Sequence, residues 1–237
     1  MSTYIYAITP AEHPLRLEGL QGVGKDGSEL RTVSTPTLSA VVSTAPEGLR
    51  AKRRDLAAHE AVLEQLMADG AVLPMRFGLV GPDDDAVVQA LEENVGVYTE
   101  RLKELDGRLE YNLKVSREEE DLLREIITTD DQVRQLNEQT RAQPDAHDAK
   151  VRLGELISQR VKTQESADSE SIVHRLAGHA VGSSAADPTT SHFMNVSFLV
   201  ERDKAAAFSE AVHQDAEQRG DAYTYYLHGP LPAYSFV

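Results

Sequence analysis

The sequence predicts an α+β protein of two domains, because short segments with a period of two alternate with segments of helical period along its 237 residues. Strand-like segments open the chain and recur near its end, whereas charged, glycine-poor sequence fills the part between them. This change near residue 116 predicts an α+β domain over 1–115 and a helix-rich α+β domain with an aromatic tail over 116–237.

The first 70 residues predict three strands and a helix. Residues 3–8 are rich in β-formers, residues 10–27 are rich in turn formers, and 29–34 with 37–43 would form a hairpin. A helix over 52–69 follows, before Gly70. Its apolar face is predicted to hold Leu56, His59, Leu63, Leu66 and Met67.

Another strand is predicted through the block Leu73–Gly78. Asp83, Asp84 and Asp85 then mark a helix N-terminus, where negative charge is favourable. A single helix ending at Asp106–Gly107 is predicted from apolar residues spaced 3, 4, 3, 4, 3: Val88, Leu91, Val95, Tyr98, Leu102 and Leu105. The next strand, 109–115, alternates apolar residues with Glu110, Asn112 and Lys114, which predicts half burial. Together these elements predict a modified ferredoxin-like sandwich for the first domain.

The second domain is predicted to begin with helices up to about residue 177, interrupted or restarted at Pro144. A small-residue loop over 182–188 precedes a strand containing Met194 to Val200. An amphipathic helix from Ala205 to Arg219 and a strand over 222–228 complete a small sheet. The helical part has weak apolar stripes at Leu122, Leu123, Ile126 and Ile127, and at Leu153, Leu156, Ile157 and Val161.

The composition narrows the classes of partner. The formal net charge of −15 opposes binding to phosphate backbones and anionic lipid, so no nucleic-acid or membrane partner is expected. The absence of cysteine excludes thiolate chemistry and cysteine-based zinc sites. The chain shows no signal-peptide pattern and no apolar run long enough to span a membrane, so a cytoplasmic protein is expected.

No residue pattern predicts catalysis, a cofactor or a metal. His174 and His179 are five residues apart, whereas helical metal-binding pairs are usually four apart. The glycines between residues 19 and 27 lack the strand and helix of a dinucleotide fingerprint. No phosphate-binding loop or nucleophile elbow occurs. We therefore expect a protein that is not an enzyme.

Two short segments carry the candidate structural or interaction residues. Arg76 lies in an apolar run beside Phe77, where it should either pair with a carboxylate or with carbonyl groups, or serve as an interaction-site arginine. The ending of the chain contains Tyr234, Phe236 and Val237, and such an ending should either pack internally or meet a partner. Its position after the strand 222–228 favours packing across the C-terminal sheet.

Three segments together resemble the gas vesicle protein L/F family: Tyr4-Ile-Tyr-Ala-Ile8, Leu73-Pro-Met-Arg-Phe-Gly78 and Gly229-Pro-Leu-Pro-Ala-Tyr-Ser-Phe-Val237. The strands 109–115 and 193–202 lie where the family has comparable segments. The ending departs from the family pattern at Leu231, where Trp is usual, and at Ala233, where a second Pro is usual.

The resemblance implies a two-domain α+β protein without enzymatic activity and without a cofactor. It also implies an accessory or minor structural role in gas vesicles, the gas-filled protein shells that give cells buoyancy. The implied partners are the small, hydrophobic shell subunit and other gas vesicle accessory proteins.

Two other hypotheses remain open at the level of sequence. A ferredoxin-like domain is also compatible with a small-molecule-binding or enzymatic protein, which a concave pocket with convergent titratable groups would favour. Within the gas vesicle hypothesis, the chain is either a transient chaperone or a component that stays in the finished shell.

Overall fold

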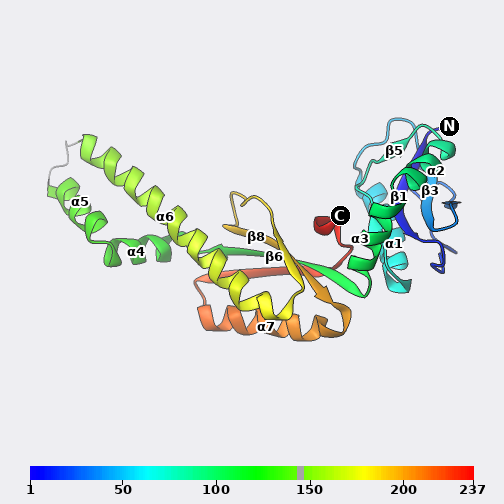
Figure 1. Ribbon diagram of the computed structural model, residues 1–237. Helices are drawn as coiled ribbons and strands as arrows, with labels where there is room; N and C mark the ends of the chain where they lie inside the picture. The colour runs from blue at the N-terminus through cyan, green and yellow to red at the C-terminus, as the bar shows by residue number, and fades with distance from the viewer. Residues whose placement is uncertain (143–146) are drawn as a thin grey trace. The chain divides into compact units, whose positions relative to one another are not determined.

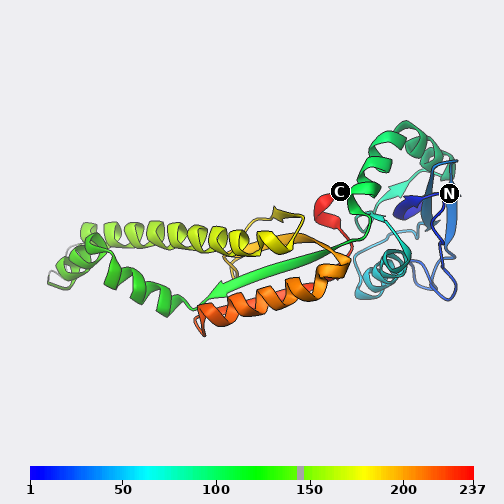
Figure 2. The same cartoon turned by 60° about the horizontal axis from the view of Figure 1, so that its bottom comes forward.

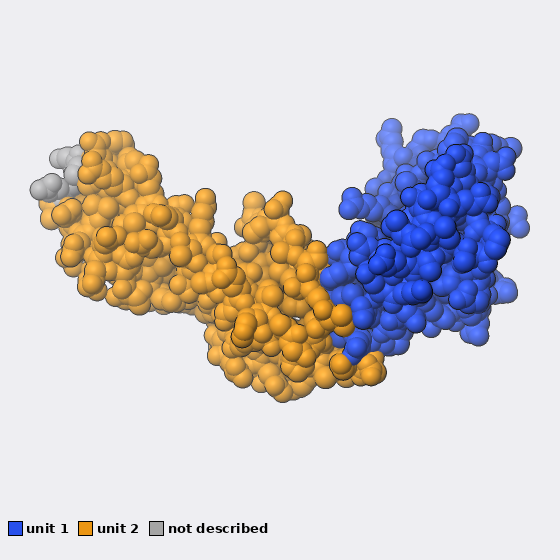
Figure 3. Space-filling model, in the orientation of Figure 1, with its two compact units in different colours: residues 1–111, 199–202, 229–237 blue, residues 112–198, 203–228 orange. Residues whose placement is uncertain are grey.

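The computed structural model describes residues 1–142 and 147–237, a mixture of helices and sheet; Pro144 lies outside the described residues. Two compact units divide the chain (Figure 3). Unit 1 contains residues 1–111, 199–202 and 229–237, and unit 2 contains 112–198 and 203–228. The tail, residues 229–237, therefore belongs to unit 1, whereas the sequence analysis placed it in the second domain.

Unit 1 contains a sheet of five short or medium strands. Its order is β2-β3-β1-β4, with β5 also beside β1, and neighbouring strands are antiparallel. The expected opening strand and hairpin are confirmed. The strands are β1 (Thr3–Pro10), β2 (Arg31–Ser34), β3 (Leu38–Thr44), β4 (Leu73–Pro74) and β5 (Val80–Gly81).

Helices cover both faces of this sheet, which explains why β3 is almost continuously buried. The helix α1 (Arg53–Asp69) packs on one face through Val62, Leu63 and Leu66. The helices α2 (Asp84–Glu93) and α3 (Val95–Leu105) pack on the other face. A register shift in β1 between Ile5 and Ala7 places Tyr6 and Ala7 together in the α1-side core.

Two elements differ from the sequence prediction. The predicted helix through Val95 is broken at Asn94, which separates α2 from α3. The Asn94 side chain donates to the Ala90 carbonyl oxygen at 2.9 Å, and Val95 is 37% exposed rather than buried. The predicted strand through Leu73–Gly78 ends at Pro74, and residues 77–78 form a turn before β5.

The second sheet has the order β7-β8-β6-β9. Along the chain this sheet has β-α-β-β-α-β connectivity, with helices within residues 119–176 before β7 and the helix 205–219 before β9. The sequence analysis predicted a modified ferredoxin-like sandwich for the first domain instead. The first sheet does not have this connectivity, since residues 11–30 between β1 and β2 contain no helix. The strands are β6 (Arg108–Arg117), β7 (Gly182–Ala185), β8 (Met194–Glu201) and β9 (Tyr223–Leu231).

The predicted helical stripes of unit 2 pack on one another. Residues of α4 (Glu119–Thr129) and α5 (Asp131–Ala142) form a small core with the first half of α6 (His147–Leu176). Figures 1 and 2 show α4 and α5 together at one end of α6. The second half of α6 and the helix α7 (Ala205–Arg219) share one face of the sheet, since side chains of β9 contact both helices and Arg117 of β6 contacts α6.

Three short 3-10 helices complete the described structure. They span Ala177–His179, Arg202–Lys204 and Tyr234–Phe236. The segment expected as a loop over 182–188 contains β7, so small residues form an edge strand there.

Candidate interaction site

The block Leu73–Gly78 forms a turn that backbone hydrogen bonds from β1 hold in place. Met75 N–H donates to the Tyr6 carbonyl oxygen at 2.9 Å, and Ile5 N–H donates to the Leu79 carbonyl oxygen at 3.1 Å. Gly78 has φ +93°, a conformation that residues with a side chain rarely adopt. We call residues 75–80 the Arg76 turn.

Buried polar groups fix the turn from the core side. The Tyr4 hydroxyl accepts from Gly78 N–H at 3.2 Å and lies 2.9 Å from His59 Nδ1, to which it donates. His59 Nε2 lies 3.0 Å from the Met75 carbonyl oxygen and donates to it. A carbonyl oxygen can only accept, so His59 Nε2 carries a proton; in the neutral ring, which burial favours, Nδ1 then accepts from the Tyr4 hydroxyl. The relay joins α1, β1 and both ends of the Met75–Gly78 backbone.

Burial shifts the pKa values of the groups in this relay. Desolvation raises the pKa of Tyr4 to about 12 and lowers the pKa of His59 below its usual value. The Phe77 ring lies edge-on to Tyr4 and His59, with centroids 6.0 and 5.8 Å apart, and packs against the α1-side core. Phe77 is thus partly buried against the core of unit 1.

Arg76 does not have the expected ion pair. Its side chain is exposed, and no carboxylate or carbonyl group among the described residues contacts it. The physical reason is that Phe77 takes the inward direction, so its neighbour Arg76 points outward. Leu79 and Val80 are each 43% exposed in the same turn. The Arg76 turn thus presents one unpaired cation and two apolar side chains on a rigidly held backbone.

The tail is held by a buried carboxylate. Glu110, which is 4% exposed, accepts from Ser235 N–H at 2.8 Å and from Ser235 Oγ at 2.7 Å. The sequence analysis placed Glu110 on the polar side of an alternating strand, and its burial corrects that expectation. A Cβ at Gly229 would lie 2.6 Å from Tyr111 Cδ1, so the chain can pass there only as glycine.

The tail packs into the cores of unit 1. Ala233 and Phe236 contact the α2/α3-side core, whereas Tyr234 contacts the α1-side core. Burial raises the pKa of the Tyr234 hydroxyl. Val237 is 51% exposed. The sequence analysis favoured packing of the tail across the C-terminal sheet. In the structure, Tyr234 and Phe236 pack against the two cores of unit 1 instead.

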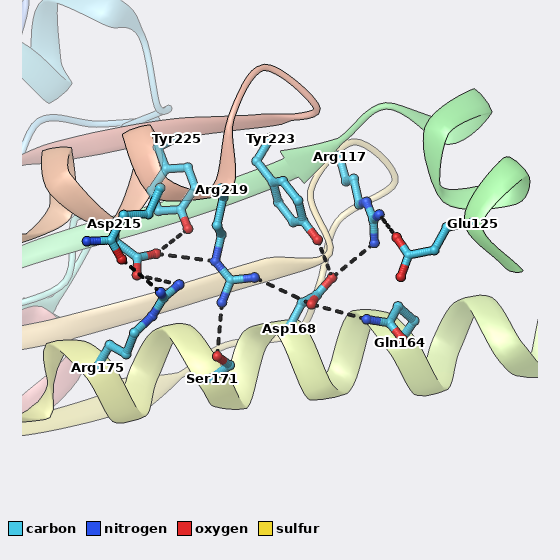
Figure 4. A network of polar contacts seen from close by, with 11 residues as sticks. Arg117, Glu125, Gln164, Asp168, Ser171, Arg175, Asp215, Arg219, Tyr223 and Tyr225 are labelled. Carbon is cyan, nitrogen blue, oxygen red and sulfur yellow. Dashed lines mark hydrogen bonds and ion pairs between the residues drawn. The ribbon is translucent and has the colours of Figure 1, made fainter. Parts of the chain in front are cut away.

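Unit 2 contains a network of buried charges (Figure 4). Asp168 of α6 lies 3.3 Å from Arg117 and 3.4 Å from Arg219, and it accepts from the Tyr223 hydroxyl at 2.8 Å. Asp215 of α7 lies 3.4 Å from Arg219, 2.5 Å from Arg175, and accepts from the Tyr225 hydroxyl at 2.5 Å. Arg117 also pairs with Glu125 of α4.

The geometry of this network indicates a structural role. The guanidinium groups of Arg117 and Arg219 lie 4.8 and 5.3 Å from the centroid of the Tyr223 ring. Burial and the bond to Asp168 raise the pKa of Tyr223 to about 12, so its hydroxyl stays protonated. Every carboxylate here is matched by a guanidinium group, which is how buried charges are tolerated. The network fastens α6 and α7 to the sheet.

Unit 1 also has a surface cavity of about 400 Å³ between β1, α1 and α3. Its titratable lining residues include Glu12, His13, Asp69 and Lys103. Both ring nitrogens of His13 are engaged, by Leu15 N–H and by the Leu66 carbonyl oxygen, and Asp69 pairs with Arg16. His13 and Asp69 are therefore engaged in contacts that support the fold.

The histidines considered as metal ligands lie apart from any ligand set. His174 lies in the last turn of α6 and His179 ends the following short helix, and both are exposed. The residues that the structure describes contain no group of three or more potential metal-ligating side chains. Asp83 caps α2 as predicted, by accepting from Ala86 N–H at 2.9 Å.

The sequence analysis missed the tertiary contacts of several residues of unit 1. Asp84 binds Arg31 and Thr3 across unit 1, and the bond from Arg31 lowers the pKa of Asp84 to about 2. Tyr4 was treated only as part of a strand. His59 was predicted to lie on the apolar face of the first helix, and no sequence signal links it to Met75.

Fold and site together define a class: a mixed α/β protein with an exposed turn that buried hydrogen bonds hold in place. The family model for "Gas vesicle synthesis protein GvpL/GvpF" matches residues 2–237. The chain therefore belongs to this family of gas vesicle proteins.

Relatives support the assignment along the whole chain. Gas vesicle protein F of Streptomyces sp. (strain CB03234) is 41% identical over 238 residues, covering 100% of both chains. Gas vesicle protein L of the same strain is 27% identical over 266 residues, covering 99% of this chain and 92% of that protein. Of these two proteins, the F protein is thus more similar in sequence to this chain.

Solved structures show the same fold. The crystal structure of GvpF from Anabaena sp. PCC7120 has a TM-score of 0.85 at 23% identity, covering 99% of this chain and 97% of that one. GvpF from Microcystis aeruginosa has a TM-score of 0.81 at 24% identity, covering 99% and 98%. Within the described residues, no helix is long and apolar enough to cross a membrane.

Proposed function

We propose that this protein is a gas vesicle accessory or minor structural protein that binds the hydrophobic shell subunit and supports assembly of the shell. The observation that carries the proposal is the Arg76 turn, together with membership of the gas vesicle family over residues 2–237. A shell subunit with an apolar surface would aggregate before incorporation, and a soluble partner can cover part of that surface.

The Arg76 turn has the properties of such a contact surface. Leu79 and Val80 supply exposed apolar area, and Arg76 supplies a free cation on a chain of formal charge −15. Because the His59 relay already fixes the backbone, binding costs little further ordering of the turn. Arg76 would pair with a carboxylate of the partner, and the two apolar side chains would lie against its apolar surface.

The experiment is co-expression of the full chain with the shell subunit, followed by affinity capture and a measurement of soluble shell subunit. We expect the wild type to retain the shell subunit, and Arg76→Glu or Leu79→Ser to reduce retention about tenfold or more, as loss of an interface centre does. Arg53→Glu and Val97→Ser change an exposed arginine and an exposed valine elsewhere in unit 1 and serve as matched controls.

Failure of the wild type to retain or solubilise the shell subunit would overturn the proposed function. Equal loss in the controls would instead exclude the Arg76 turn as the contact surface. Flotation of washed vesicles, probed for this chain, distinguishes a retained shell component from a transient chaperone in the cytoplasm.

A further inference from the structure

The strand β9 forms an open edge of the second sheet. It spans the nine residues Tyr223–Leu231, ends the order β7-β8-β6-β9, and pairs with β6 alone among the described strands. The backbone groups on the outer side of an edge strand can pair with another extended chain.

This edge lacks the protection that the other edges have. Natural proteins keep edge strands short, or place charges or proline on them. β7 and β2 have four residues each, and β2 begins with Arg31. In contrast, residues 222–237 contain no Asp, Glu, Lys or Arg, and the first proline, Pro230, comes late in β9. The six residues 223–228 are therefore an unprotected strand of high β-propensity.

The side chains on one face of β9 anchor this strand to α6 and α7 and so keep its outer edge ordered. Tyr223 and Tyr225 point toward α6 and α7, where Asp168 and Asp215 bind their hydroxyl groups. Thr224, Tyr226 and His228 are exposed on the opposite face, and Tyr226 is 45% exposed. The Tyr226 ring lies edge-on to His192, with centroids 5.2 Å apart. A partner strand would thus meet an ordered edge bordered by an exposed tyrosine.

We propose that the β9 edge is a strand-pairing surface whose occupant is a second copy of this chain, with the two β9 strands antiparallel about a two-fold axis. Such an axis brings the same segment of both copies together, so the segment must be compatible with itself. The formal charge of −15 makes most self-contacts repulsive, whereas residues 223–228 bring no acidic or basic side chain to the pair. Tyr226 of each copy can then pack across the junction.

This inference uses a surface in unit 2, whereas the proposed contact with the shell subunit uses the Arg76 turn of unit 1. The overall negative charge still opposes association of two copies, so the dimer should be weak at low salt and stronger when salt screens the repulsion.

The test is sedimentation equilibrium of the full chain over a wide range of concentration at low and high salt. We expect a monomer–dimer equilibrium that salt strengthens. Tyr226→Lys should weaken it about tenfold or more, because the two copies then bring like charges together. Thr224→Lys is a second variant at an exposed position, and Ser183→Lys on the exposed edge strand β7 is the control. Circular dichroism and unfolding midpoints verify that each variant folds.

A strictly monomeric chain at both salt concentrations would overturn the proposal. So would a dimer that both β9 variants leave unchanged, or that the β7 control weakens equally. If the chain is monomeric and Tyr226→Lys abolishes capture of the shell subunit, the edge belongs to that partner and the second copy is excluded. A salt-strengthened dimer in a chain that fails to capture the shell subunit would uphold this inference while overturning the proposed function.

Discussion

At the scale of single residues, His59 connects the buried core to the exposed turn. Its two ring nitrogens contact Tyr4 and the Met75 carbonyl oxygen, and Tyr4 in turn holds Gly78 N–H. A protonated ring could not accept from the Tyr4 hydroxyl, so the relay requires neutral His59. The conformation of the Arg76 turn and the protonation of one histidine are therefore linked.

This linkage predicts a dependence of stability on pH. Burial lowers the folded-state pKa of His59 below the ordinary value of 6.5, so the unfolded chain binds more protons as the pH falls below that value. The free energy of unfolding should be insensitive to His59 above this pH and should decrease as the pH falls toward the folded-state pKa. Urea unfolding of the wild type at a series of pH values between neutral and weakly acidic measures this slope.

His59→Gln should flatten the slope, although it should also lower stability at neutral pH. His179→Gln changes an exposed histidine and should leave the slope unchanged. A slope that persists in His59→Gln would assign the pH dependence to other groups.

At the scale of elements, unit 2 depends on buried ion pairs as well as on apolar packing. Arg219 lies between Asp168 and Asp215, and the side chains of the three residues are 11%, 11% and 4% exposed. Arg219 thereby joins α7 to α6, while Tyr223 and Tyr225 join both helices to β9. Removing one partner of such a pair leaves the opposite charge buried.

Arg219→Met should therefore lower the free energy of unfolding by about 3–5 kcal/mol. Arg101→Met removes an ion pair with Glu104 in which both side chains are about half exposed, and it should cost about 1 kcal/mol or less. Chemical denaturation followed by circular dichroism measures the free energy of unfolding of both variants and of the wild type. Equal effects would show that the buried network contributes no more than a surface pair.

At the scale of the whole molecule, unit 1 is built from three separate parts of the chain. Its α2/α3-side core includes Leu199 and Ala233 in addition to residues before 111, and Glu110 binds Ser235 of the tail. A core assembled from distant segments cannot close until all of them are present. We therefore predict that the boundary near residue 116 does not delimit a self-sufficient domain.

A chain consisting of residues 1–115 should consequently fail to fold cooperatively. It leaves the buried Glu110 carboxylate without its two donors and exposes the positions that Ala233, Tyr234 and Phe236 cover. We expect poorly dispersed amide resonances and no cooperative unfolding transition, in contrast to the full chain under the same conditions. A stable, cooperative 1–115 chain would contradict this view of unit 1.

The local sequence pattern by itself predicted the positions of most helices and strands and the family of this protein. Periods of two and 3.6 located β1, the β2–β3 hairpin, α1, β6, β8 and α7, because burial of one face imposes these periods on the sequence. The helical stripes at Leu122–Ile127 and Leu153–Val161 were predicted from spacing, and they pack together as one core. Three short segments were also sufficient to indicate the family.

Only the tertiary structure decided the rest, because it depends on contacts between residues far apart in sequence. Glu110 alternates like an exposed residue but is buried, since Ser235 satisfies it across 125 positions. Arg76 lies in an apolar run but is exposed, since Phe77 takes the inward direction beside His59. The spatial order β7-β8-β6-β9 of the second sheet is set by pairing between strands far apart in sequence, which no local pattern records.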